Sequence, residues 1–441
     1  MTAPARWVDL AVPEATPTLR VTVSPLPIVE PMALFAQRGV HDGVYWAQPS
    51  AGRFVAGIGT AAAFHADGPD RLKQAAAWWR RVLASADVTA EAGAPAAPLC
   101  FGGASFDPLR SLETPWQPFG GAWFVVPALT FLVDSRGAWL VSAEPADGSR
   151  IGPAELWPAE RTPSSPTPAR CVADSAAAFC AGVRQAVEEI ERRRYDKLVL
   201  ARQVVYTRRP RFDTLAAIAR LQADYPTCTT FAFARGEHVF LGATPERLVR
   251  LNGRELQTMC LAGSAPRGAD AVDDARQAAA LLADEKERYE HAVVVAAMRE
   301  ALAPLCDEVV VPDEPVVSTL PYLHHLQTSV IGWLRPTETI LTVVDELHPS
   351  PAVGGAPREA ALAAIRRYEG FDRGWFAGPV GWLDGEGGDF VVALRSALVA
   401  TDKAWLFAGC GVVASSNPDR ELRETDLKLL PMRVALEVER R

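Results

Sequence analysis

Residues 229–260 read TTFAFARGEHVFLGATPERLVRLNGRELQTMC. This stretch contains four short runs rich in β-branched, aromatic and other apolar residues, at 229–234, 238–243, 247–251 and 255–260. The first two runs flank the turn Arg235-Gly236, and the last two flank Asn252-Gly253, a dipeptide that favours tight hairpin turns. Consecutive hairpins of this kind predict antiparallel sheets rather than parallel βαβ units.

The sequence on both sides continues the pattern. Further strands are expected at 122–126, 128–133, 138–142, 197–206 and 404–408, with a strand pair around 384–388. The first three of these are interpreted together as a hairpin, because Ser135-Arg136-Gly137 is a typical turn sequence. Helices are expected at 71–84, 175–194, 214–225 and 273–305 (interrupted at most once) and at the C-terminus, with Ser175 as an N-cap. We therefore predict an α/β protein of the α+β type, with large, mainly antiparallel sheets and helices packed outside.

Length and composition bound the domain organisation. The chain has 441 residues, 49% of them hydrophobic, which is enough for a large core and suggests two or three domains on length alone. Residues 1–150 are β-rich, and 175–440 contain the longer elements. Between them, residues 152–169 include five prolines, a composition that fits either a linker between domains or a long surface connection within one domain.

Charge and cysteine content narrow the functional class. The chain has 45 Lys and Arg against 53 Asp and Glu, a net charge of −8, which disfavours nucleic acid as the main partner. A small anionic substrate remains compatible, because it responds to a local pocket rather than to the total charge. The seven cysteines form no C-x-x-C pair, and no apolar run reaches the roughly 18 residues of a membrane span. We expect a cytoplasmic protein with free thiols and no membrane partner.

Two carboxylate pairs are candidate metal ligands. Glu287 and Glu290 are three residues apart in an expected helix, and Glu421 and Glu424 have the same spacing in another. Residues at this spacing share one helix face, so two such helices could bind a hard cation such as Mg²⁺. Taken alone, both pairs also fit solvated helix faces with ordinary ion pairs, for example between Glu424 and Lys428.

Three further features are candidates for chemistry. The Gly-rich segment 408–416 is expected to form a turn whose backbone amides could approach an anion, or a simple connection. Glu246, after Pro245 at the end of a strand, could be a buried general acid or part of a surface pair. Lys197 shares a strand face with Val199 and Ala201, so it is either a base with a lowered pKa or a lysine extending towards solvent.

These features occur, in order, within a set of blocks that resembles the chorismate-utilising enzymes. That family contains isochorismate synthases, salicylate synthases and the large components of anthranilate and aminodeoxychorismate synthases. The resembling blocks are 197–202, 242–248, 261–268, 284–291, 325–328, 347–355, 376–382, 390–395 and 409–428. The resemblance is strong over about residues 175–440 and extends weakly upstream through 101–106.

The resemblance implies a single chorismate-binding domain over residues 1–441, with stacked antiparallel sheets and an active site in a cleft. Residues 152–169 then become a connection rather than a boundary. The implied reaction is nucleophilic attack at C2 of chorismate with loss of the C4 hydroxyl, aided by Mg²⁺ on the ring carboxylate.

The resemblance also assigns roles to residues. It implies that Lys197 is the general base and Glu246 the general acid, that Glu290 and Glu424 bind Mg²⁺ directly, and that Glu287 and Glu421 hold metal-bound water. The implied substrate-binding residues are Gly263, His325, Ala352, Val353, Arg395, Gly409, Gly411 and Lys428.

The lysine at position 197 favours water over ammonia as the nucleophile, because water needs a general base. Ala262 stands where aminodeoxychorismate synthases often have a nucleophilic lysine, and residues 348–355 resemble the isochorismate synthase form of that loop. We therefore expect an isomerase, a Mg²⁺-dependent isochorismate synthase whose product could enter menaquinone or siderophore biosynthesis. The alternatives are a salicylate synthase, which also eliminates pyruvate, and, from another class, a carboxylate-bridged metal oxidase.

Overall fold

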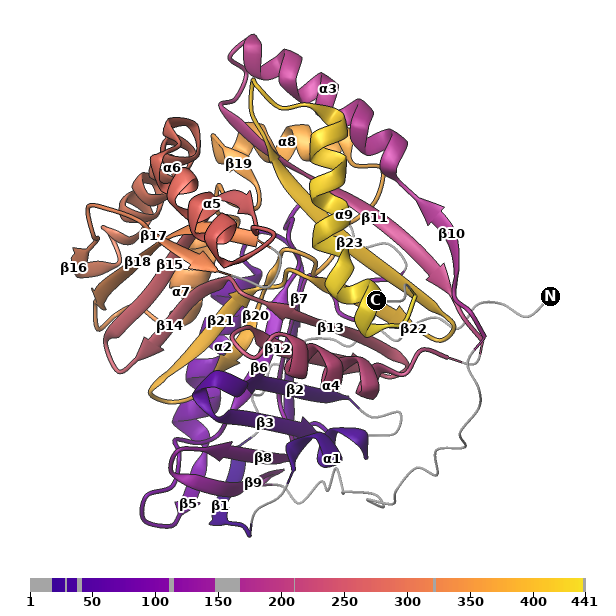
Figure 1. Ribbon diagram of the computed structural model, residues 1–441. Helices are drawn as coiled ribbons and strands as arrows, with labels where there is room; N and C mark the ends of the chain where they lie inside the picture. Colours follow the sequence, from indigo (N-terminus) through magenta and orange to yellow (C-terminus); the bar gives the residue numbers. More distant parts are fainter. Residues whose placement is uncertain are drawn as a thin grey trace.

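Two stacked β-sheets, flanked by helices, organise the computed structural model of the chain (Figure 1). The structure describes residues 18–27, 30–37, 42–110, 115–146, 167–209, 211–319 and 323–438.

The first sheet has thirteen strands. In spatial order these are β10 (Arg170–Asp174), β11 (Lys197–Thr207), β23 (Lys403–Val412), β22 (Ser396–Ala400), β13 (His238–Thr244), β12 (Thr229–Arg235), β2 (Gly43–Gln48), β3 (Arg53–Ile58), β8 (Leu129–Asp134), β9 (Gly137–Pro145), β1 (Leu19–Pro25) and β5 (Asp87–Ala90), with β19 (Gly355–Ala356) paired to β11.

The second sheet has ten strands. In order these are β16 (Cys306–Val310), β18 (Leu323–Leu334), β15 (Glu255–Pro266), β14 (Arg247–Asn252), β21 (Gly387–Val392), β20 (Pro379–Leu383), β6 (Cys100–Ala104), β7 (Ala122–Val126) and β4 (Ala62–Ala66), with β17 (Val316–Thr319) paired to β18. Among the described residues β1 and β5 run parallel, and the other strand pairs are antiparallel, as the hairpin pattern predicted.

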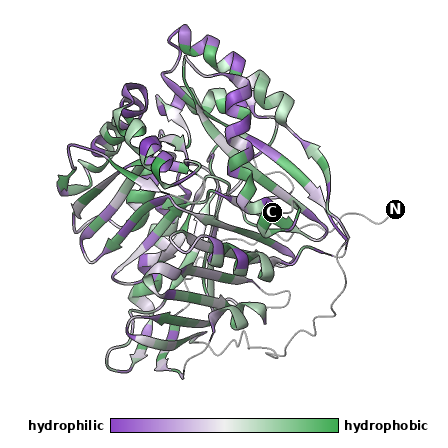
Figure 2. Cartoon of the chain, in the orientation of Figure 1, coloured by the Kyte–Doolittle hydropathy of each residue, from purple (hydrophilic) through white to green (hydrophobic). Residues whose placement is uncertain are grey.

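Helices cover the outer faces of the sheets. They are α1 (Pro31–Ala36), α2 (Arg71–Ser85), α3 (Ala176–Glu191), α4 (Thr214–Asp224), α5 (Ala271–Ala283), α6 (Glu285–Leu302), α7 (Ile340–Leu347), α8 (Arg358–Tyr368) and α9 (Pro418–Ala435). Hydrophilic and hydrophobic residues alternate along α3 and α9, as expected for helices with one face on a sheet (Figure 2). Within the described ranges, no helix combines the length and the apolar character that a membrane span requires.

The N-terminal part of the chain completes both sheets of the C-terminal part. Strand β2 pairs with β12 in the first sheet, and β6 pairs with β20 in the second. The aromatic core is shared in the same way, since the Trp116 ring contacts Phe240 and Phe407. The chain therefore forms one large domain of stacked, mainly antiparallel sheets, as predicted. Of the Pro-rich connection, residues 152–166 lie outside the described residues.

Most expected elements are present, with small changes at their ends. The expected long helix at 273–305 is divided once, at Asp284, whose side chain accepts a hydrogen bond from the Glu287 amide and so caps α6. Ser175 occupies the N-cap position of α3, but its hydroxyl accepts from the Gln203 amide of β11 instead of capping the helix.

Two local predictions were wrong. Residues 122–126 and 129–134 do not lie in one hairpin, because β7 belongs to the second sheet and β8 to the first. The chain changes sheets at Pro127, and the hairpin consists of β8 and β9 alone. In addition, Gly409 and Gly411 do not lie in a turn. They are part of β23, where pairing with β11 keeps them extended.

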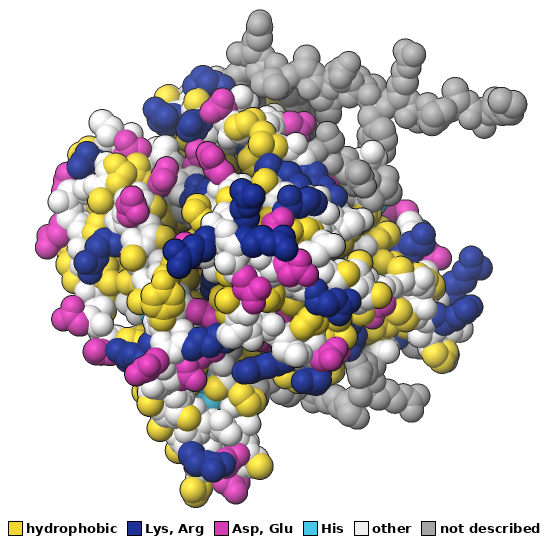
Figure 3. All heavy atoms as spheres, turned by 90° about the horizontal axis from the view of Figure 1, so that it is seen from above, with side chains coloured by type: hydrophobic (Ala, Val, Ile, Leu, Met, Phe, Trp, Pro, Cys, Tyr) yellow, Lys and Arg dark blue, Asp and Glu magenta, His cyan; other side chains and the backbone are white. Residues whose placement is uncertain are grey.

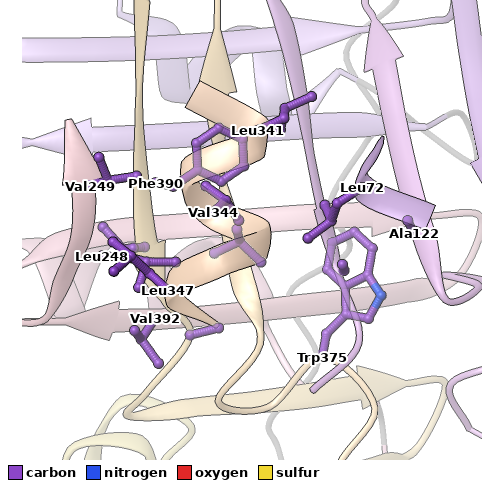
Figure 4. Packing of buried hydrophobic residues seen from close by; sticks show 14 of the residues in the cluster. Leu72, Ala122, Leu248, Val249, Leu341, Val344, Leu347, Trp375, Phe390 and Val392 are labelled. Atoms are coloured by element: carbon purple, nitrogen blue, oxygen red, sulfur yellow. The ribbon is translucent and has the colours of Figure 1, made fainter. Parts of the chain in front are cut away.

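Helix α7 packs between the second sheet and α2, so its apolar side chains should contribute to stability. Leu347 is 3% exposed and lies in the apolar cluster with Leu248 and Val392 (Figure 4). Replacing Leu347 by alanine removes buried methyl groups and leaves a cavity, which costs roughly 2–5 kcal/mol. We expect Leu347→Ala to lower the free energy of unfolding in urea, followed by tryptophan fluorescence, by this amount. The same substitution at Leu109, which is 63% exposed, should have little effect, and equal losses would contradict the packing.

Candidate active site

A single pocket gathers every predicted site residue. It opens where β11 and β23 of the first sheet meet β15 of the second, with α6 and α9 alongside. The predicted residues that line it are Lys197, Glu246, Gly263, Glu287, Glu290, His325, Ala352, Val353, Arg395, Gly409, Gly411, Glu421, Glu424 and Lys428. On the face of the molecule that Figure 3 shows, Lys and Arg are interspersed with Asp and Glu.

Strands β11 and β23 form the wall from which Lys197 projects. Lys197, Val199 and Ala201 all line the pocket, as strand alternation predicted. Gly411 is paired beside them, and a Cβ atom at this position would lie 3.1 Å from Lys197 Cε. The absence of a side chain at Gly411 therefore leaves the space in which the lysine lies.

Burial controls the ionisation of Lys197. Its side chain is 9% exposed, and burial lowers its pKa although Glu290 opposes this effect. Lys197 Nζ lies 3.7 Å from Glu290 Oε2. Burial also raises the pKa of Glu290, and the nearby carboxylates Glu287 and Glu424 add to that rise. Both shifts favour uncharged forms, so the pocket favours a lysine that can accept a proton.

Glu246 is held between the two sheets. Its amide donates to Thr244 Oγ1 (3.2 Å), and its carbonyl accepts from the Val392 amide (3.0 Å). Burial raises the pKa of Glu246 to about 7, although Lys428, Lys197 and Arg395 act in the opposite direction. A carboxyl group that keeps its proton near neutral pH can serve as a general acid.

Arg395 and Lys428 place positive charge in the pocket. The Arg395 guanidinium has no hydrogen-bond or ion-pair partner among the residues that the structure describes, and burial lowers its pKa. Its backbone adopts φ +48°, a left-handed conformation that is costly for a residue with a side chain. Lys428 Nζ contacts Glu424 Oε1 (2.7 Å) and donates to Gly409 O (3.0 Å). An unpaired guanidinium in a pocket is suited to binding a carboxylate.

The four predicted metal ligands face the pocket from two helices. Glu287 and Glu290 lie on α6, and Glu421 and Glu424 lie on α9. Over the described ranges, no group of three or more His, Cys, Asp or Glu side chains is arranged to hold a metal ion. Glu290 and Glu424 are each paired with a lysine. The carboxylates are nevertheless close enough to repel one another, since the charge of Glu424 raises the pKa of both Glu290 and Glu421. Four neighbouring carboxylates are a donor set that fits a hard divalent cation.

A bulge in β15 orients His325. The register shifts between Ala262 and Ser264, where Gly263 has φ +81°. Ser264 Oγ then lies 2.9 Å from His325 Nδ1, and the Ser264 amide donates to Glu287 Oε2 (3.0 Å). Burial lowers the pKa of His325 to about 3, with Arg395 and Lys428 adding to the effect, so the imidazole is neutral.

Sequence reasoning missed several residues that line the pocket. Lys286 lies 3.6 Å from Glu287 Oε1, and Arg420 and Phe376 face the same space. Arg373 also lines the pocket and is only 3% exposed. The one available signal for Arg373 was its position four residues after Glu369, a common spacing for an ion pair.

The chain is similar in sequence to known chorismate-binding proteins. The chorismate binding enzyme family matches residues 11–437. The salicylate biosynthesis isochorismate synthase of Pseudomonas aeruginosa is 41% identical over 411 residues, which cover 89% of this chain and 84% of that protein. Isochorismate synthase MenF of Bacillus subtilis is 33% identical over 434 residues, covering 94% and 92%.

Among solved structures, MenF, the menaquinone-specific isochorismate synthase of Escherichia coli, has the same fold. It superimposes with a TM-score of 0.82 at 26% sequence identity and covers 97% of this chain and 96% of its own. The family match over nearly the whole chain, supported by two long relatives above 30% identity, shows that this protein belongs to the chorismate binding enzymes.

Proposed function

We propose that this protein is an isochorismate synthase that adds water at C2 of chorismate and removes the C4 hydroxyl. The observation that carries the proposal is the pairing, in one pocket, of a buried lysine whose pKa is lowered with a buried carboxyl group whose pKa is raised. The names of the relatives from P. aeruginosa and B. subtilis support the same reaction.

The two groups suit the proton transfers of this reaction. The neutral Lys197 amine takes a proton from water as the water oxygen bonds to C2. Glu246 gives its proton to the C4 oxygen as the C4–O bond breaks, and the ring double bonds shift between these carbons. One water is added and one is lost, so the product is an isomer of the substrate.

Mg²⁺ is the cofactor that we assign to the four carboxylates. Glu290 and Glu424 would bind it directly, and Glu287 and Glu421 would hold its water molecules. When bound, Mg²⁺ supplies positive charge to the ring carboxylate of chorismate. Lys197 and Lys428, which pair with Glu290 and Glu424 in this structure, would lose part of that pairing to the metal.

Chorismate is a dianion, and the remaining pocket residues fit its two carboxylates. Arg395 offers a guanidinium fork, and Lys428 lies beside the backbone of Gly409. Gly263, Gly411 and the neutral His325 contribute polar contacts, whereas Ala352 and Val353 present apolar surface to the ring.

The arrangement of the helices disfavours the metal oxidase alternative. Carboxylate-bridged di-iron sites of that class are built inside four-helix bundles. Here α6 packs on β15 and β18, whereas α9 packs on β23 of the other sheet.

Product analysis tests the reaction. The purified protein is incubated with chorismate and Mg²⁺, and the products are separated by chromatography. We expect isochorismate as the sole product. Salicylate together with pyruvate would indicate a salicylate synthase, and a product that forms only with added ammonia would indicate an anthranilate-type enzyme.

Replacing the proposed base should remove water addition but not substrate binding. We expect Lys197→Ala to lower kcat by about 10²–10⁴-fold, the usual contribution of general base catalysis, while chorismate binding remains measurable by calorimetry. Lys403→Ala, at an exposed position on β23, is the matched control. Wild-type turnover by Lys197→Ala at neutral pH would exclude Lys197 as the base.

The raised pKa of Glu246 predicts a pH dependence. The acid must carry a proton, so activity should fall as the pH rises through about 7, where Glu246 ionises. Glu246→Gln should lower kcat by about 10²–10⁴-fold, and its residual activity should lose this alkaline decline. A glutamine variant with the wild-type rate and pH profile would contradict the assignment.

Removal of a proposed metal ligand should raise the Mg²⁺ requirement. Loss of an outer-shell partner typically weakens metal binding by about 10–100-fold, and loss of a direct ligand should reach at least this range. We expect Glu290→Gln to raise the Mg²⁺ concentration for half-maximal activity accordingly, with a parallel loss in calorimetric Mg²⁺ binding. Glu300→Gln, on the same helix, should leave both unchanged. An unaltered requirement in Glu290→Gln would contradict the site.

A further inference from the structure

One edge of β11 lacks a strand neighbour beside the pocket. Strand β19 pairs with β11 at residues 197–198, and β10 pairs with it at 204–207. Residues 199–203 on this side therefore have no strand partner among the described residues. Unpaired backbone groups are costly when buried, so another part of the chain must satisfy them.

The Val199 amide donates to Gly354 O, and the backbone of Gln203 bonds Ser175. A buried ion pair supplies partners for two groups between them. Arg373 Nη2 donates to Val199 O (2.8 Å), and the Ala201 amide donates to Glu369 Oε1 (2.7 Å). Arg373 and Glu369 bind each other through two contacts, of 2.5 and 2.8 Å. Their side chains are 3% and 2% exposed, so this contact is shielded from solvent.

The same arginine reaches a second wall of the pocket. Arg373 Nη1 donates to Val353 O (3.0 Å), and the guanidinium lies 4.1 Å from the ring centre of Phe106. Val199 and Ala201 share the pocket face with Lys197. The ion pair thus joins the strand that carries Lys197 to the loop that carries Val353.

We propose that Glu369 and Arg373 are positioning residues, which hold the Lys197 strand against the Val353 loop so that the base faces the substrate. The proposal rests on the proposed function. A buried ion pair pays a large desolvation cost and often stabilises a protein no better than apolar residues would, so fold stability alone is a weak reason for its presence. Its three hydrogen bonds to the backbone and the two between its own side chains instead fix distances within the pocket. A misplacement of about 1 Å there can reduce catalysis by roughly 10²-fold.

Two variants test the proposal. Arg373→Lys keeps the charge but loses the guanidinium fork, and Glu369→Gln/Arg373→Gln removes both charges together, so no uncompensated charge remains buried. We expect both proteins to fold, and kcat to fall by at least about 30-fold while the KM for chorismate changes less than threefold. Arg373→Lys should keep more activity than the double variant, because the positive charge beside Glu369 is retained.

Hydrogen exchange gives a readout that does not depend on catalysis. In both variants the guanidinium fork no longer fixes the acceptor oxygen at position 369, so the Ala201 amide should lose part of its protection. The Leu200 amide, which faces β23 by strand alternation, should keep its protection. If the wild-type protein does not convert chorismate, the proposed function fails. The exchange difference at Ala201 would still report whether the ion pair of Glu369 and Arg373 holds β11 in place.

The control is a more exposed ion pair of the same residue classes, which does not line the pocket. Arg366, on α8, binds Asp107 through two hydrogen bonds of 2.5 and 2.7 Å. Arg366→Lys should leave both kcat and KM within threefold of wild type. The proposal is overturned if Arg373→Lys retains wild-type kcat, or if kcat and KM change equally in the Arg373 and Arg366 variants.

Discussion

The burial of one amine, Lys197, is the constraint on which the rest of the site depends. An ammonium group surrounded by apolar strand residues is unstable, so its pKa falls and a neutral amine becomes accessible. The glycine at position 411 leaves space for the Lys197 side chain. The carboxylate of Glu290, 3.7 Å away, partly offsets the cost of burying its charge. The same burial keeps Glu246 protonated up to about neutral pH. The proposed base and the proposed acid thus owe their opposite pKa shifts to one physical cause, burial.

The stacked sheets explain how residues far apart in the chain meet. Lys197 comes from a strand of the first sheet, His325 from a strand of the second, and the carboxylates from helices on each. Among the described residues, those that line the pocket all lie after position 196, whereas β2 and β6 complete the two sheets. Through these pairings the N-terminal part packs against both of the sheets whose strands line the pocket.

Sequence patterns predicted what depends on neighbours along the chain. The Asn252-Gly253 hairpin and the carboxylate pair at Glu287 and Glu290 follow from local turn chemistry and helix spacing. The change of sheet at Pro127 and the extended form of Gly409 were missed, because distant strands decide both. Arg373 was missed for the same reason, since it binds Val199, which lies far away in sequence.

The central claim is that the pocket activates a water molecule for attack at C2. The most direct test is to run the reaction on chorismate with Mg²⁺ in water enriched in oxygen-18 and to analyse the product by mass spectrometry. If water is the nucleophile, each isochorismate molecule formed in a single turnover carries one heavy oxygen, at C2. Unlabelled isochorismate would show that the original hydroxyl migrates within the substrate, and this would contradict the account.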